Sequence, residues 1–377
     1  MKICIISNAH PASDVRLYYK LAISLAKQHQ VWLITATGLP NSEHNPYQIV
    51  VEPDSPRPAL KHIQNEALKL KPDLVICVEP LTLLIARVLK RKLNCRVIFD
   101  VHEFYADAYA ERFPFFLRPL AKLAYLAGLK YLQRIADGVF SVNQDVLNQL
   151  LGADKAQRGT VLPNYPVKNV WDYACDTPGA LAQLCEMRFD LIYAGGLTAQ
   201  RGIFKIMKVA TLLKHDFPEL KILILGKFFD PKVEAEFNRS INDYNLNTVI
   251  YYQQWIPAEK IGLLLKRCRY GLWLFNPHSR RFRLSIPLKV LEYLSAGLPV
   301  ITIKTPQMKA LIEYNKLGVL TSYHARNIAA TISKMLRLDE TEYQAMSKRC
   351  LDVSATRFNW EALEPQIFAA ISRAMQR

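Results

Sequence analysis

Short apolar runs rich in β-branched residues recur along this chain, and helical patterns lie between several of them. The runs in the first half are KICIIS, VWLIT, DLVIC, RVIFD and GVFSV, and those in the second half are FDLIYAG, KILILG, TVIYY, YGLWLF and PVITI. Continuously apolar strands that alternate with helices are typical of parallel sheets covered on both faces. The alternation therefore predicts an α/β fold built on parallel sheets.

Two domains are expected because the alternation breaks once. The break lies near residues 162–188, where LPNYPVKNVWDYACDTPGA combines prolines and asparagines with a mixed polar run, as a linker does. A chain of 377 residues is also longer than one ordinary core. We expect one domain over residues 1–165, a second over 166–359, and a C-terminal helix at about 360–377 that packs back on the first.

Composition constrains the partner and the compartment. The formal charge of +16 and the pI of about 9.5 favour phosphates, an acidic membrane surface or nucleic acid as partners. Seven cysteines without a CxxC pair fit reduced thiols in a cytoplasm. The apolar run in MKICIIS is too short for a signal peptide, and no apolar run reaches the roughly 18–20 residues of a spanning helix. We therefore expect a cytoplasmic protein.

The loops that follow the predicted strands are the candidate sites. Ligands of open parallel sheets bind beyond the carboxyl ends of the strands, whereas residues inside the strands form the core. This criterion selects the following loops: residues 7–16, 100–107, 195–202, 226–228 and 276–287.

One of these loops, YAGGLTAQRGI, follows a strand and opens a helix. Gly195 and Gly196 allow close backbone approach, and Arg201 lies near a helix N-terminus, where backbone N–H groups already favour an anion. A diphosphate suits this position. The alternative is a plain strand-to-helix turn with a surface arginine.

Two loops of the first domain also carry polar side chains directly after strands. SNAHPASDVRLYYK contains His10, Asp14 and Arg16, which either face a cleft or include a helix N-cap and a surface arginine. FDVHEFYAD contains His102 and Glu103, and this histidine suits a sugar hydroxyl or a phosphate. The alternative is a structural histidine beside a solvated glutamate.

The stretch SIPLKVLEYLSAGLPV holds one acid, Glu292, in a nearly apolar helix. Ser285 and Pro287 suit the start of this helix, and Gly297 suits its end. Glu292 lies roughly opposite the apolar face, so we expect it in water or in a cleft rather than in the core. The region Lys266–Lys289 carries seven bases and no acid, which is either a phosphate clamp or a solvated charge run.

A basic and aromatic segment raises the question of membrane contact. Residues 112–136 hold five bases and no acid, interleaved with phenylalanine, tyrosine and leucine, and RVLKRKLNCR forms a second basic cluster at 87–96. Such a segment suits an anionic membrane surface. The alternative is a domain helix whose apolar face is core.

Taken together, the motifs resemble the family 4 (group 1) retaining glycosyltransferases with the GT-B fold. The resemblance covers nearly the whole chain and rests on these segments in order: D-x-H-E at 100–103, LPN at 162–164, GGLTAQRG at 195–202, IPLKVLEYLSAGLPVI at 286–301 and LIEYNKLGVL at 311–320. It implies two Rossmann-like parallel-sheet domains facing a central cleft, with the acceptor bound by the N-terminal domain and a nucleotide-sugar donor by the C-terminal domain.

The resemblance also implies residue roles. Glu292 would bind the donor ribose, and Arg201 would take the place of a lysine that clamps the diphosphate. Retention of the anomeric configuration would follow from a same-face attack in which the leaving phosphate helps to take the proton. The remaining candidates are His102 and Glu103 for catalysis, Gly195, Gly196, Ser285, Ile286, Pro287 and Lys289 for the diphosphate, and His10, Asp14 and Arg16 for the acceptor loop.

Two positions depart from the family pattern. Leu284 stands where the first glutamate of an acidic pair is usual, and Gly196 stands where an arginine is usual. Neighbouring bases are candidates to supply the missing charge, namely Arg280, Arg281, Arg283 and Lys289. The sequence has no D-x-D motif, so we expect no metal and no cofactor, with cations and backbone amides in their place.

The leading hypothesis is a cytoplasmic glycosyltransferase, peripheral on the inner face of the cell membrane, that serves cell-surface polysaccharide biosynthesis. It would use a nucleotide-sugar donor and a glycan or lipid-linked acceptor. A non-catalytic two-domain nucleotide or sugar binder is the alternative, and release of free nucleotide from donors separates the two. No nucleic acid is expected as a partner, because no RNA or DNA motif accompanies the basic runs.

Overall fold

A computed structural model describes residues 1–39, 42–51, 56–101, 105–110, 113–152, 158–168, 180–257, 260–278 and 286–377. The chain divides into two compact units. The first unit comprises Met1–Asn164 and Trp360–Arg377, and the second comprises Tyr165–Asn359. Each unit is built around its own sheet and its own core.

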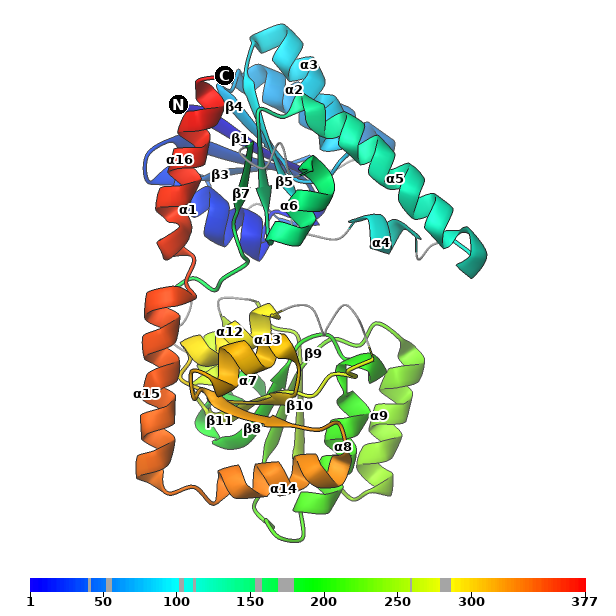
Figure 1. The fold of residues 1–377 in the computed structure, drawn as a ribbon, viewed down its shortest axis with the longest axis vertical. Helices are drawn as coiled ribbons and strands as arrows, with labels where there is room; N and C mark the ends of the chain where they lie inside the picture. The colour runs from blue at the N-terminus through cyan, green and yellow to red at the C-terminus, as the bar shows by residue number, and fades with distance from the viewer. Residues whose placement is uncertain are drawn as a thin grey trace. The chain divides into compact units, whose positions relative to one another are not determined.

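The first unit contains a parallel sheet in the order β3-β2-β1-β4-β5-β6-β7 (Figure 1). Its central strands are mostly apolar because helices cover both faces. The strands are β1 (Lys2–Pro11), β2 (Gln30–Thr37), β3 (Tyr47–Val50), β4 (Leu74–Cys77), β5 (Arg96–Val101), β6 (Gly138–Ser141) and β7 (Gly159–Val161).

The helices of the first unit include one from the far end of the chain. α16 packs against β5, β6 and β7, so the C-terminal segment completes this unit. Ahead of α1, Val15–Ala22 forms a π-helical segment. The helices are α1 (Ile23–Ala26), α2 (Pro56–Leu70), α3 (Thr82–Leu93), α4 (Tyr105–Ala110), α5 (Arg118–Leu132), α6 (Gln144–Leu151) and α16 (Glu364–Met375).

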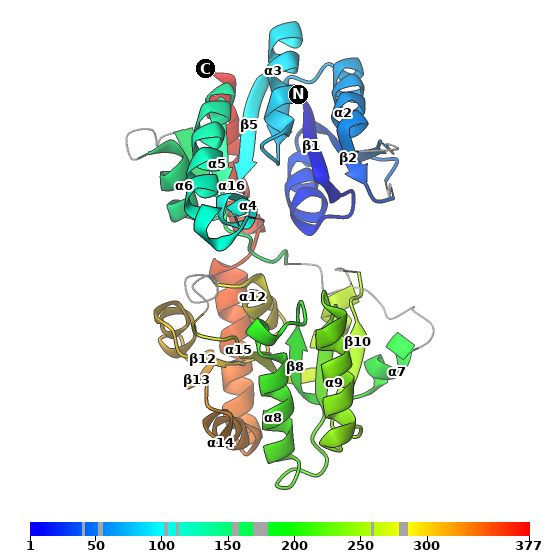
Figure 2. The same cartoon turned by 90° about the vertical axis from the view of Figure 1, so that its right-hand side faces the viewer.

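The second unit contains a parallel sheet in the order β10-β9-β8-β11-β12-β13 (Figure 2). Its strands are β8 (Phe189–Ala194), β9 (Ile222–Gly226), β10 (Ile250–Gln254), β11 (Cys268–Trp273), β12 (Val300–Ile303) and β13 (Gly318–Thr321). Its helices are α7 (Ala180–Glu186), α8 (Ile203–Leu213), α9 (Pro231–Asp243), α10 (Ile261–Leu265), α12 (Leu288–Ser295), α13 (Pro306–Met308), α14 (Ala325–Leu336) and α15 (Glu340–Arg357).

The expected class, two parallel α/β sheets, is confirmed. The apolar runs missed β3 and β7, which are short edge strands with half-buried residues. The expected linker at 162–188 was partly wrong, because α7 lies within it and buries Leu181 and Cys185 in the core of the second unit. Its seven residues, ALAQLCE, make only about two turns, so the helical period is too short to stand out beside the polar run before it.

Candidate functional site

Each sheet has one place where the strand order reverses, and that place is the expected ligand crevice. In the first unit the chain builds β2 and β3 on one side of β1, and β4 onward on the other. In the second unit β9 and β10 lie on one side of β8, and β11 onward on the other. Ligands of open parallel sheets bind at the carboxyl ends of the strands at such a point.

The second unit's crevice opens because β8 and β11 separate before they end. Their pairing stops at Ile192 and Gly271, and beyond it the Tyr293 hydroxyl accepts a hydrogen bond from the Ala194 N–H (2.7 Å) and donates one to the Leu272 carbonyl (3.4 Å). A Cβ on Gly271 would lie 2.3 Å from the Tyr293 ring, so glycine allows this close packing. Tyr293 therefore anchors α12 at the crevice.

The glycine loop after β8 follows the end of β9 closely. The Gly195 N–H donates to the Leu225 carbonyl (2.9 Å), and the Leu197 N–H donates to the Lys227 carbonyl (2.9 Å). A Cβ on Gly226 would come within 1.9 Å of the Gly195 carbonyl oxygen. Only glycine fits there, so the loop lies directly against the carboxyl end of β9.

Arg201 projects back over this loop from the start of α8. Its N–H donates to Thr198 Oγ1 (3.2 Å), and Gly202 follows with φ +85° as the N-cap of α8. A Cβ on Gly196 would lie 2.7 Å from Arg201 Nη1, so the guanidinium covers Gly196. The Tyr193 hydroxyl lies beneath it. Burial raises the pKa of this hydroxyl above its ordinary value, and the neighbouring Arg201 offsets only part of that rise. Arg201 and the helix N-terminus therefore form an anion-binding corner.

Glu292 is buried, so the solvated alternative was wrong. Its side chain is 12% exposed, and its Oε2 lies 2.8 Å from Lys289 Nζ. The Lys289 ammonium in turn lies 4.3 Å from the centre of the Trp255 ring. Helical periodicity showed that Glu292 does not share the apolar face of α12. It could not show that Trp255, just after β10, contacts the lysine that pairs with Glu292. Two predicted donor residues, Glu292 and Lys289, are thus brought together as an ion pair.

The start of α12 also differs from the prediction. α12 begins at Leu288, with Pro287 at the N-cap, whereas Pro287 was expected in the first turn. Proline has no backbone N–H, so Pro287 cannot donate to a phosphate as predicted. Ile286 is 42% exposed and keeps its N–H. The helix ends at Ser295, two residues before Gly297, whose φ is +75°.

Two predicted acceptor residues have structural roles instead. Asp14 Oδ1 accepts the Arg16 N–H (2.8 Å) and the Leu17 N–H (3.0 Å), so Asp14 is an N-cap. The Arg16 side chain is 4% exposed and binds Asp100 through two bonds of 2.7 and 2.8 Å. Arg16 was expected in a cleft or on the surface, and both expectations were wrong. The acidic partner that buries it lies 84 residues away in sequence.

His10 lies at the crevice of the first unit, beside a carboxylate that the sequence analysis missed. Glu79 Oε1 accepts the Ser7 hydroxyl (2.5 Å), its Oε2 accepts the Asn8 N–H (3.0 Å), and His10 Nδ1 lies 3.8 Å from Oε1. Glu79 is the second residue after the predicted strand DLVIC, so the strand-end criterion applied to that loop would have found it. The cluster offers hydroxyl-binding groups at the reversal point.

Several predicted residues lie outside the described part of the chain. They are His102, Glu103, Leu284 and Ser285, together with Arg280, Arg281 and Arg283 of the basic run. Another member of that run, Arg269, pairs with Glu340 at 3.2 Å and so has a structural partner. Within the described ranges, no group of three or more His, Cys, Asp or Glu side chains is arranged to hold a metal ion.

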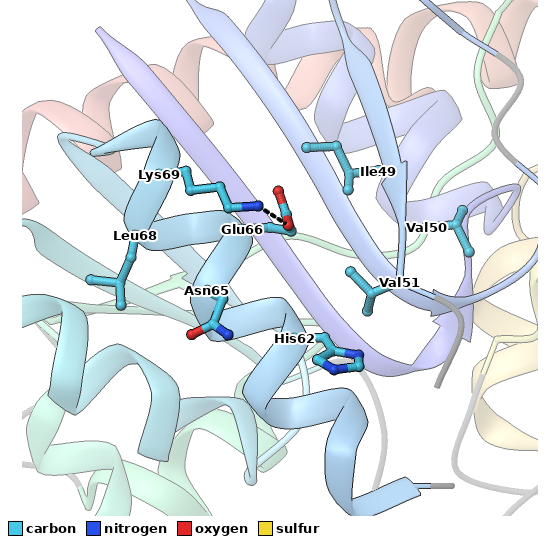
Figure 3. A pocket seen from close by; sticks show the side chains of 8 residues that line it. All are labelled: Ile49, Val50, Val51, His62, Asn65, Glu66, Leu68 and Lys69. Carbon is cyan, nitrogen blue, oxygen red and sulfur yellow. Dashed lines mark hydrogen bonds and ion pairs between the residues drawn. The ribbon is translucent and has the colours of Figure 1, made fainter. Parts of the chain in front are cut away.

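A hollow of about 660 Å³ lies in the first unit, between β3 and α2 (Figure 3). Ile49 and Val51 line one side, and His62 lines the other. The charged side chains there, Glu66 and Lys69, pair with each other at 2.6 Å along one helix. No converging set of chemical groups marks this hollow as the site.

Known proteins similar to this chain agree with the two-unit division. Residues 15–165 match the family Glycosyltransferase Family 4, and residues 183–350 match Glycosyl transferases group 1. The chitobiosyldiphosphodolichol beta-mannosyltransferase of Kluyveromyces lactis is 27% identical over 165 residues, which is 43% of this chain and 35% of that protein. The putative colanic acid biosynthesis glycosyltransferase WcaL of Salmonella typhimurium is 23% identical over 182 residues, or 48% of this chain and 44% of that one.

These alignments span less than half the length of either curated relative. A solved structure matches throughout: HepE from Anabaena in complex with UDP and glucose has a TM-score of 0.70 at 15% identity, covering 99% of both chains. That likeness identifies the fold, two Rossmann-like units of the GT-B class. By its two family matches and this fold, the chain belongs to the group 1 glycosyltransferases.

Proposed function

We propose that this chain transfers a sugar from a nucleotide-sugar donor to a glycan or lipid-linked acceptor in cell-surface polysaccharide biosynthesis. The observation that carries the proposal is the Arg201 guanidinium lying over Gly196 at the N-terminus of α8, in the crevice of the second unit. Family membership supports the reaction class. The names of the relatives, one acting on a diphosphodolichol-linked sugar and one in colanic acid biosynthesis, support the acceptor class.

The chemistry follows from where charge develops. When the bond between the sugar and the diphosphate breaks, negative charge grows on the leaving group, and fixed cations with helix N–H groups stabilise it there. Arg201 supplies a planar cation suited to a diphosphate. We expect the reaction to need no metal and to retain the anomeric configuration, with the leaving phosphate taking the acceptor proton.

The buried pair of Glu292 and Lys289 suits the rest of the donor. A carboxylate accepts two ribose hydroxyls, and the Lys289 ammonium lies 2.8 Å from the Glu292 carboxylate. In the first unit, His10 and Glu79 would meet the acceptor hydroxyl. The non-catalytic alternative keeps the same binding groups but lacks turnover.

The donor arm has a direct test. Thermal-shift measurements with UDP-, GDP-, ADP- and CMP-linked sugars should reveal one donor class by stabilisation. Arg201→Ala should weaken binding of that donor by about tenfold or more and slow turnover by roughly 10²–10³-fold, because a charge-assisted contact to the leaving group is lost. Free nucleotide release reports turnover.

Arg239→Ala is the matched control, because Arg239 is exposed on α9 and lies outside the glycine loop. Unchanged donor affinity and turnover in Arg201→Ala would contradict the assignment of the clamp. If the parent protein binds a donor tightly but releases no nucleotide with every acceptor tested, the non-catalytic binder is favoured.

We also propose that α5 brings the protein to an anionic membrane surface. Although α5 is rich in leucine, Leu129 is its buried side chain, and the others are half-buried or exposed. Arg118 and Lys130 are exposed on it, and α5 carries no acid. The exposed apolar side chains on α5 and the turn before it include Phe115 (83%), Phe116 (76%), Leu120 (64%) and Leu123 (66%). Among the described residues, no helix is long and apolar enough to span a bilayer.

Replacing two of these leucines should reduce membrane binding. We expect Leu120→Ser with Leu123→Ser to weaken partition onto phosphatidylglycerol vesicles by about tenfold or more, because buried leucine contributes about 1.5–3 kcal/mol. Flotation of the protein with vesicles at several salt concentrations measures this partition. Leu351→Ser on α15, where Leu351 is 46% exposed, should leave partition unchanged. Equal partition of all three proteins would contradict a role for α5.

A further inference from the structure

The apolar surface of α5 is hollowed as well as exposed. Between α4 and α5 runs a groove of about 390 Å³, lined by Tyr109, Phe113, Leu117, Leu120, Ala121, Ala124 and Tyr125. These two helices pack together, and α5 runs beyond the sheet with α4 beside its N-terminal half (Figure 1). The lining carries no charged side chain and is predominantly apolar, so hydrocarbon is the chemistry that suits it best.

The walls of the groove are preformed rather than collapsed. The Tyr109 ring lies 4.7 Å from Tyr125 and 5.2 Å from Phe113, centre to centre. Aromatic rings held against each other resist closure of the space between the helices. The small side chains Ala121 and Ala124 line the same groove, so the volume results from alanine at these positions.

The rim of the groove is cationic. The Arg118 Nε–H donates to the carbonyl of Phe113, a lining residue, at 3.1 Å, so the guanidinium is fixed at the rim. Lys122 follows the lining residue Ala121 along α5, and no acid interrupts the helix. An apolar groove with fixed positive charge at its rim is complementary to an amphiphile with one hydrocarbon chain and an anionic phosphate head.

We propose that this groove binds the hydrocarbon chain of the lipid-phosphate acceptor, with the head group held by Arg118. The inference rests on the proposed function for the existence of a lipid-linked acceptor, and it adds the site that receives the lipid. The exposed protein surface around Phe115, Phe116 and Leu123 would bind the membrane without selecting a lipid. The groove would instead bind one hydrocarbon chain drawn from the bilayer. An acceptor with a longer chain would bind more tightly until the groove is filled.

The test separates the groove from the surrounding surface. The probe is a farnesyl phosphate carrying an environment-sensitive fluorophore, used below its critical micelle concentration with the full chain. Ala124→Trp fills the groove but adds apolar surface, and Ala127→Trp makes the same substitution on an exposed part of α5 outside the lining. Circular dichroism and thermal melting verify that both variants fold.

We expect the parent protein and Ala127→Trp to bind one probe per chain with equal affinity, and Ala124→Trp to bind at least tenfold more weakly. Excess inorganic phosphate should not displace the probe. Partition of Ala124→Trp onto phosphatidylglycerol vesicles should equal or exceed that of the parent, because apolar area is gained. Equal probe binding by both tryptophan variants, or binding that never saturates, would overturn the proposal.

Failure of the proposed function gives a different pattern. Absence of nucleotide release with every donor, while Ala124→Trp still loses the probe, would leave a lipid-phosphate groove on a protein that is not a transferase. Normal release and transfer with a probe that binds both variants alike would leave the transferase and remove the groove.

Discussion

Arg16→Ala is expected to destabilise the first unit by about 3–5 kcal/mol, the range found when one partner of a buried ion pair is removed. The Asp100 side chain is 0% exposed, and Arg16 donates to both of its oxygens. Without the guanidinium, that carboxylate must either stay charged in the core or take up a proton. Both outcomes lower the free energy of unfolding.

Arg16 also connects segments that are distant in sequence. Its Nη1 donates to the carbonyl of Leu162 at 3.2 Å, and its guanidinium lies 5.6 Å from the centre of the Trp360 ring. One turn along the helix, Lys20 Nζ donates to Asn164 Oδ1 at 2.6 Å. Leu162, Asn164 and Trp360 lie where the chain leaves and re-enters the first unit. Loss of Arg16 should therefore loosen the segment that leaves the first unit at Asn164 and the segment that re-enters it at Trp360.

Hydrogen exchange measured by mass spectrometry can locate the effect. In Arg16→Ala, peptides from β1, β5 and α16 should exchange faster, whereas peptides from the second unit should keep their protection. Lys69→Ala is the control, because the pair of Lys69 and Glu66 is exposed and its loss costs less than about 1 kcal/mol. Arg16→Met with Asp100→Leu should recover most of the stability, since neither charge remains buried. Equal protection in Arg16→Ala and Lys69→Ala would contradict the burial argument.

The fold could be predicted from the sequence because it depends on local patterns. Strands buried on both faces are recognisable as apolar runs, and the helical patterns between them indicate parallel pairing. Edge strands such as β3 and β7 escaped because they are not continuously apolar. The helix α7 escaped because its seven residues are too few to show a helical period.

The site was less predictable because burial and pairing depend on long-range contacts. Position after a strand could be read from the sequence for Gly195 and Arg201, which follow β8, because that property is local. The same criterion gave Arg16 a false role, because Asp100 reaches it from β5. Glu292 was taken as solvent-facing or cleft-facing, yet its burial depends on Lys289 and on the strand end that carries Trp255. No periodicity within one helix contains that information.

Gly202→Ala should disrupt the second unit more than any other glycine substitution near the diphosphate corner. Gly202 has φ +85°, which costs an alanine about 1–2 kcal/mol, and its Cβ would lie 1.8 Å from the Leu274 carbonyl oxygen. The neighbour is backbone, so the start of α8 must shift away from β11. We expect a loss of stability of about 3–5 kcal/mol from backbone strain and overpacking together.

The same shift should damage donor binding, because Gly202 joins the Arg201 turn to α8. The Asn276 N–H donates to the Gln200 carbonyl at 2.8 Å, so the turn is also tied to the segment after β11. Gly202→Ala should therefore move the Arg201 guanidinium and the helix N–H groups together, and lose donor affinity to at least the extent that Arg201→Ala does. Calorimetric titration with the donor identified by thermal shift measures this loss.

Gly128→Ala separates this effect from a general effect of replacing glycine. Gly128 lies inside α5, and a Cβ built on it meets no atom within 4 Å. Alanine there should stabilise the first unit by about 0.5–1 kcal/mol, because less backbone entropy is lost on folding. A Gly202→Ala protein as stable as the parent, with unchanged donor affinity, would mean that α8 can move away from Leu274 without moving Arg201. In that case Arg201 would be fixed by its own contacts with Gly196 and Tyr193 rather than by the start of the helix.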